Sequence, residues 1–165
     1  MCYCDRLPEL FEVPEPYNWN ALQNKAYRFF LKDVIHRYIT FQGKRAYGSS
    51  CPTEGCHRCR FEHIISMDDT ATGDRNPDTE RLRRITWIRP LIELNCTCSD
   101  YKVFPDSGGS RMRWRIWCSR VNYIIVLEDR GAYFRLITAY NVIYRNKRKS
   151  LEQEYNEYIE DNSIN

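Results

Sequence analysis

The sequence lacks any long apolar segment. Its longest uninterrupted apolar run, Tyr123 to Leu127, is far shorter than the roughly 20 residues that a membrane-spanning helix needs. The first residues, Met1 to Asp5, have neither the basic start nor the apolar centre of a secretory signal. We therefore expect a cytoplasmic protein without a membrane partner.

The sequence also lacks the motifs of several common enzyme classes. Its 7 glycines form no phosphate-binding loop, and we find no nucleophile elbow and no paired-carboxylate motif. Dehydrogenases, kinases and α/β hydrolases are therefore disfavoured. Only three histidines are present, at positions 36, 57 and 63. His63, which lies between apolar Phe61 and Ile64, is the best candidate for a general acid or base, with a buried structural histidine as the alternative.

Positive charge is concentrated rather than abundant. The formal net charge is only +3, yet arginines and lysines cluster at 81–89, 111–120 and 145–149. Such patches on a nearly neutral chain favour a partner with a phosphate backbone, such as RNA. The aromatic share of 14% is typical both of aromatic-rich cores and of surfaces that bind single-stranded nucleic acid. For any single cluster, a solvated arginine face is the alternative.

Eight cysteines are present in a chain that we expect in a reducing compartment, where thiols and metal ligands are commoner than disulfides. Five of them form two groups along the chain, namely Cys51, Cys56 and Cys59, then Cys96 and Cys98. A Cys-x-x-Cys and a distant Cys-x-Cys are compatible with a structural zinc site, which Cys2 and Cys4 could join. The spacing matches no zinc ribbon, and free thiols are the alternative.

The first two thirds of the chain alternate between ordered and irregular segments. After an irregular arm over 1–19, apolar residues at helical spacing predict a helix over 20–39. We expect a Cys-rich loop over 43–60, a short apolar element over 61–65 and an exposed loop over 66–79. Residues 84–92 are interpreted as an extended segment that Pro90 interrupts, with a short element after it, and 96–109 as a loop.

The last third has the clearest pattern. Residues 111–118 alternate, with arginines on one face and Trp114 and Ile116 on the other, which predicts a half-buried strand. A buried strand over 123–127, a turn that ends at Gly131, and a returning strand over 132–140 follow. An amphipathic helix is expected over 147–160. The sequence thus predicts a single α+β domain over 1–165, with a central antiparallel β-sheet and a helix near each end.

Three segments carry a resemblance to a known group of proteins. They are Phe61-Glu62-His63-Ile64, the Arg-rich segment 84–92, and the hairpin 123–140, which ends in Thr138-Ala139-Tyr140. Their order resembles the barnase, EndoU, colicin E5/D and RelE-like superfamily of phage-associated nucleases. In that superfamily a His-bearing element precedes an Arg-rich segment, and a β-hairpin with a Thr-Ala-Tyr-like end closes the sheet. The resemblance covers residues 57–150 and implies a RelE/barnase-like nuclease fold.

The resemblance implies a toxin-like endoribonuclease from a phage or mobile element, which cleaves RNA by attack of the 2′-hydroxyl and requires no metal or other cofactor for catalysis. Such cleavage needs a base, an acid and cationic donors for the phosphate. Carried over by position, the site residues are His63 as acid or base, Arg81, Arg83 or Arg84 on the phosphate, and Thr138 and Tyr140. A cognate inhibitor protein is a further expected partner.

Two other functions stay open at this point. One is a zinc-stabilised module that binds nucleic acid without cleaving it, because the cysteines are not part of the nuclease pattern. The other is a protein-binding inhibitor whose aromatic residues form an interface.

Overall fold

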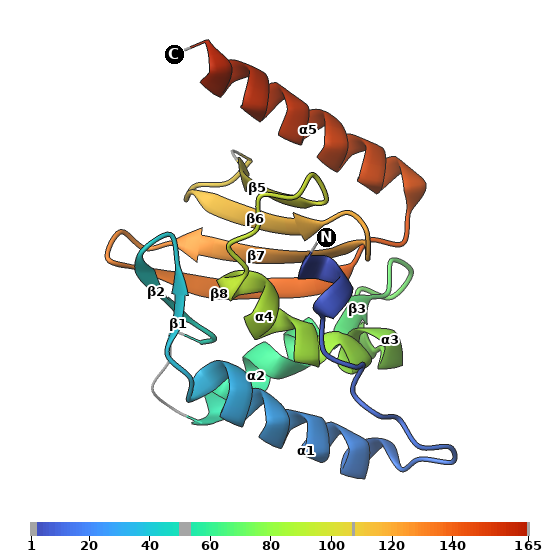
Figure 1. The fold of residues 1–165 in the computed structure, drawn as a ribbon. Helices are drawn as coiled ribbons and strands as arrows, with labels where there is room; N and C mark the ends of the chain where they lie inside the picture. Colours follow the sequence, from blue (N-terminus) through green and yellow to red (C-terminus); the bar gives the residue numbers. More distant parts are fainter. Residues whose placement is uncertain (1–2, 50–53, 107, 165) are drawn as a thin grey trace.

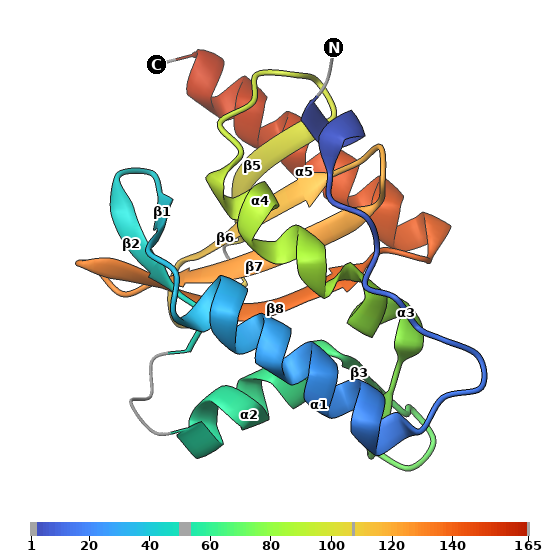
Figure 2. The same cartoon turned by 60° about the horizontal axis from the view of Figure 1, so that its bottom comes forward.

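The computed structural model describes residues 3–49, 54–106 and 108–164, and it shows an α+β fold (Figure 1). A curved six-stranded sheet forms the middle layer, with the strand order β1-β2-β8-β7-β6-β5. Helices α1 to α4 lie on one side of this sheet and α5 lies on the other (Figures 1 and 2). Within the described residues, no helix has both the length and the apolar character that crossing a membrane requires.

The first helix, α1 (Trp19–Phe30), continues into a π-helical turn, η2 (Leu31–Ile35). Asn18 caps α1, because its side chain accepts a hydrogen bond from the backbone N–H of Ala21 at 3.1 Å. One face of α1 is buried against the core, as its apolar spacing predicts. The helix expected over 20–39 is therefore confirmed up to residue 35, whereas its last residue begins strand β1 (Ile39–Phe41).

The sheet is mixed, and the expectation of a purely antiparallel sheet is wrong at one strand. Strand β2 (Lys44–Tyr47) pairs with β1 in antiparallel fashion and with β8 in parallel. Parallel pairing joins segments that are far apart in the chain, so no local turn signals it.

The Cys-rich segment 43–60 is not a loop, because β2 and most of helix α2 (Glu54–Ile64) occupy it. Cys51 lies outside the described residues. Helix α2 escaped prediction because only its end, at Phe61 and Ile64, enters the core, so it has little apolar periodicity. The segment that follows, expected to be a loop, forms a small hairpin of β3 (Ser66–Asp68) and β4 (Arg75–Pro77).

The segment interpreted as extended before Pro90 is helical. It consists of α3 (Thr79–Arg83), the 3-10 turn η3 (Arg84–Trp87) and α4 (Ile88–Glu93). Pro90 is the third residue of α4, and in the first turn of a helix the missing N–H of proline has no intrahelical partner to lose. Part of the loop expected over 96–109 is strand β5 (Tyr101–Asp106).

The elements expected in the last third are confirmed. They are strands β6 (Arg113–Cys118), β7 (Tyr123–Asp129) and β8 (Tyr133–Asn141), followed by helix α5 (Arg145–Ser163). Gly131, in the turn between β7 and β8, has a positive φ of 81°, which glycine adopts without strain.

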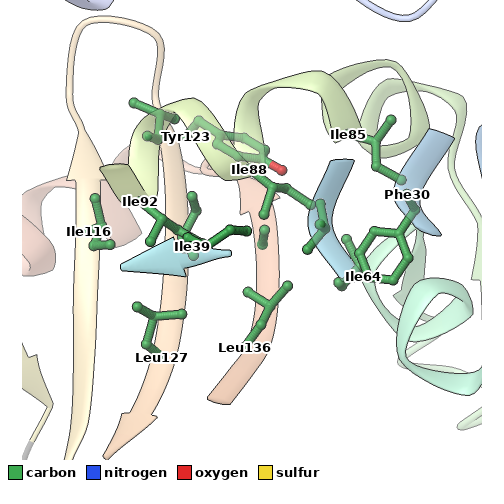
Figure 3. Close-up of a cluster of buried hydrophobic side chains, with 14 of the residues drawn as sticks. Phe30, Ile39, Ile64, Ile85, Ile88, Ile92, Ile116, Tyr123, Leu127 and Leu136 are labelled. Carbon is green, nitrogen blue, oxygen red and sulfur yellow. The ribbon is translucent and has the colours of Figure 1, made fainter. Parts of the chain in front are cut away.

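The main core lies between the sheet and the helices on its α1–α4 side. Figure 3 shows Ile88 and Ile92 of α4 directed at the side chains of Ile116 and Leu127 on the strands. A second, smaller core lies between the sheet and α5 and consists of Phe104, Trp117, Ile124, Val142 and Leu151.

Strand β6 is buried on both faces, although its sequence predicts one exposed face. Arg115 is only 6% exposed and Trp117 only 2%, because α5 covers the face on which both lie. Arg115 is tolerated there since its Nη2 forms an ion pair with Glu154 Oε2 of α5 at 2.6 Å and also donates to the carbonyl oxygen of Pro105.

Burial of Trp117 under α5 gives the first prediction. Trp117→Ala should lower the free energy of unfolding by about 3–5 kcal/mol, the usual loss for a large buried aromatic residue. Arg113→Ala, on the same face but half-exposed, should change it by less than about 0.5 kcal/mol. Urea unfolding monitored by circular dichroism measures both values. Equal stability of the two variants would show that α5 does not cover this face.

Candidate active site

His63 lies where α2 ends and the β3–β4 hairpin begins, and its side chain is half-buried. The Arg75 guanidinium closes this junction. Its Nη2 donates to the carbonyl oxygens of His63 and Ser66, each at 2.9 Å, and it also forms an ion pair with Asp68. The last carbonyls of a helix have no intrahelical partner and attract cations. Arg75 therefore holds the end of α2, and His63 with it, against the hairpin.

Arg81 connects the same junction to the end of β8. Asp78 caps α3, accepting hydrogen bonds from the backbone N–H groups of Glu80 and Arg81, so the position of Arg81 on α3 is well defined. Arg81 Nη1 donates to Ser66 O at 2.7 Å, and the guanidinium carbon lies 5.2 Å from the ring centroid of Tyr140. A single side chain thus contacts both the His63 junction and Tyr140.

Arg60 is a third cation near His63. It precedes His63 by three residues in α2, so the two side chains share a helix face. Arg60 Nη1 donates to the carbonyl oxygen of Ile137 at 2.7 Å. The register shift between β7 and β8 leaves Ile137 unmatched in the ladder, as in a β-bulge. This bond fixes α2 against β8 immediately beside Thr138.

The surroundings of His63 favour its neutral form. Burial lowers the pKa of His63 below 6.5, and the positive charges of Arg75, Arg60 and Arg81 lower it further, although Asp68 opposes them. A neutral imidazole can accept a proton at neutral pH. Burial also raises the pKa of Tyr140, whose hydroxyl therefore stays protonated and can donate. The site thus contains a proton acceptor and a proton donor on either side of Arg81.

An open hollow of about 570 Å³ lies beside His63. The α1 residues Trp19 and Gln23 line one side of it, and Ser66 and Arg75 of the hairpin line the other. The imidazole is therefore accessible to a bound molecule.

The structure separates the residues that the sequence proposed for the phosphate. Arg81 lies near His63, whereas Arg83 and Arg84 both form ion pairs with Glu80, at 3.2 and 2.8 Å. Thr138 is half-buried in β8 opposite Val126. Of the six predicted residues, His63, Arg81 and Tyr140 are therefore joined by direct or electrostatic contacts.

Arg60 and Arg75 were missed by the sequence analysis. The spacing of Arg60 from His63 would have indicated it, had 54–64 been recognised as a helix. Arg75 gave no such signal, because its place beside His63 depends on the pairing of β3 with β4.

The cysteines proposed as metal ligands lie on separate parts of the fold. Cys56 and Cys59 are exposed on α2, whereas Cys96 and Cys98 lie in the loop from α4 to β5, which is remote from α2 in both views (Figures 1 and 2). Cys98 is disulfide-bonded, contrary to the expectation of reduced thiols. Over 3–49, 54–106 and 108–164, no three histidine, cysteine or carboxylate side chains form a group that could hold a metal ion.

Comparison with known proteins identifies no relative of this chain: no family model, no curated protein and no solved structure matches it.

Proposed function

We propose that the chain is a metal-independent endoribonuclease of the toxin type, with a RelE/barnase-like fold and His63 in its active site. The observation that carries the proposal is a neutral histidine beside arginines whose charge is not taken up by a carboxylate. The hydrogen bonds that position Arg60 and Arg81 go to backbone carbonyls, those of Ile137 and Ser66. An anion can therefore still benefit from both positive charges, whereas Arg83 and Arg84 are already paired with Glu80.

RNA fits these groups chemically. His63 would take the proton of the 2′-hydroxyl, whose oxygen then forms a bond to phosphorus, while the bond from phosphorus to the 5′-oxygen breaks. Arg81 and Arg60 would stabilise the additional negative charge on the phosphorus oxygens in the transition state. Tyr140 would give its proton to the departing 5′-oxygen. The products would be a cyclic phosphate and a 5′-hydroxyl, and no metal is needed in any step.

The proposal predicts that His63→Ala slows RNA cleavage by about a hundredfold or more, the usual effect of losing one acid–base group. His36→Ala is the matched control, because His36 is exposed at the end of η2. Cleavage of labelled RNA, resolved on gels, measures both rates. Activity should persist in EDTA and be absent on a 2′-deoxy substrate.

Intact RNA after incubation with the pure protein, or equal rates for the His63 variant and the wild type, would contradict this assignment. RNA binding without cleavage would instead support the non-catalytic module.

The arginine assignment predicts a second difference. Arg81→Gln should lower the cleavage rate by about a hundredfold, since it removes a donor to the transition state. Arg83→Gln should lower it far less, because Arg83 is paired with Glu80. Single-turnover rates at saturating protein separate this effect from weaker binding. Similar losses in the two variants would mean that Arg81 has no special place in the site.

The lowered pKa of His63 predicts the pH dependence. A general base acts in its neutral form, so the rate should rise with pH through a midpoint below 6.5, the ordinary value for histidine. Arg75→Gln removes a positive charge beside His63 and should move this midpoint to higher pH, whereas Arg75→Lys keeps the charge and should leave it nearly unchanged. Measurement of kcat/KM against pH tests both. A midpoint that does not respond to the charge at position 75 would exclude His63 as the base.

A further inference from the structure

Cysteines from three separate parts of the chain meet at the end of the sheet remote from β1. Cys4 belongs to the N-terminal turn η1 (Tyr3–Arg6), Cys96 to the loop between α4 and β5, and Cys118 to the last position of β6. Cys4 and Cys118 are 3% and 0% exposed, and their side chains are hydrogen-bonded to each other. Cys96 is close enough to both that its charge would affect Cys4, and Cys98 follows two residues later.

Tyr101 locates the three sulfurs independently. Its ring is buried, and its hydroxyl donates to the carbonyl oxygen of Leu91 at 2.9 Å. Burial raises the pKa of Tyr101, and Cys4, Cys96 and Cys118 each raise it further, so all three lie near this one hydroxyl. The sulfurs therefore form one cluster rather than a pair and a distant third.

The segments that carry the cysteines are held together by other contacts. Arg120, which follows β6, forms ion pairs with Asp5 of η1 at 2.7 Å and with Asp100, before β5, at 3.8 Å. Figure 2 shows η1 beside the loop that connects α4 to β5. The backbone N–H of Cys98 donates to Cys96 Sγ at 3.3 Å. Hydrogen bonds of this kind orient metal-binding groups from outside the coordination shell.

Neutral thiols make a poor reason for this arrangement. Burial and the neighbouring thiols raise the pKa of Cys4 to about 12, so close packing of several cysteines opposes their ionisation. A divalent cation reverses that effect, because a thiol bound to it is deprotonated outright. Four sulfurs are also the ligand set that zinc most often takes in tetrahedral structural sites.

We propose that Cys4, Cys96, Cys98 and Cys118 bind one Zn²⁺ ion as a structural tetrathiolate site, which forms when the disulfide of Cys98 is reduced. The site joins the N-terminal arm to β6 and to the loop before β5. It is distinct from the α2 cysteines and independent of RNA cleavage.

The disulfide explains why the described side chains do not already form a metal-binding group. Its reduction takes two electrons and two protons from two molecules of a low-molecular-weight thiol, which leave as their own disulfide. Zn²⁺ then displaces the protons of the four thiols, which pass to the buffer, and four zinc–sulfur bonds form.

The test uses the full chain, purified with a reducing thiol, dialysed against Zn²⁺ and then freed of unbound metal. Elemental analysis should find one zinc per chain, and Co²⁺ in its place should give the thiolate charge-transfer bands of a tetrahedral sulfur site. Cys4→Ser and Cys96→Ser should each weaken zinc binding by at least about a hundredfold, the upper range for loss of an outer-shell partner alone. Cys56→Ser and Cys59→Ser are the matched controls and should bind zinc as the wild type does.

Several outcomes would overturn the proposal. They are a reduced wild type that takes up no zinc, loss of binding in the Cys56 and Cys59 variants, or unchanged binding in the Cys96 variant. Cys96 is only half-buried, so Cys96→Ser should fold even if Cys4→Ser does not, and circular dichroism checks both. Protein oxidised before dialysis should bind no zinc, and full binding by that sample would show that Cys98 is not a ligand.

Discussion

Both faces of strand β7 are closed to water, and this constraint sets the position of the elements around it. Tyr123 and Ile125 face the helices, Ile124 faces α5, and all are fully buried. A buried strand must satisfy its backbone hydrogen bonds with neighbouring strands, so β6 and β8 run beside it over nearly its whole length. Cys118 of β6 and Asn141 of β8 both pair with Tyr123. The proposed zinc site and the proposed active site therefore lie at the same end of these three strands.

The arginines of this protein differ in what holds them. Carboxylates bind Arg83, Arg84 and Arg115, and these pairs serve the fold. Backbone carbonyls position Arg60 and Arg81, which leaves their charge effective at His63. A basic patch in a sequence does not distinguish these two situations, because the distinction depends on which acceptor the folded chain supplies.

Local patterns were sufficient for elements whose partners are close in sequence. The β7–β8 hairpin and α5 were predicted because alternation, a turn glycine and helical spacing are local signals. The parallel pairing of β2 and the cover that α5 gives to Trp117 depend on distant segments and had no such signal. The same limit applied to the site: His63 stood out by its apolar neighbours, whereas Arg75 reaches it only through the β3–β4 hairpin.

The two outer strands of the six-stranded sheet each have a feature that discourages growth of the sheet by another chain. Strand β1 has only three residues, so it offers few free backbone groups to a foreign strand. Strand β5 contains Pro105, which has no N–H to donate and whose carbonyl oxygen accepts from Arg115. Copies of this protein at high concentration are thus poorly suited to join edge to edge, even though the strands between these edges are among its most apolar segments.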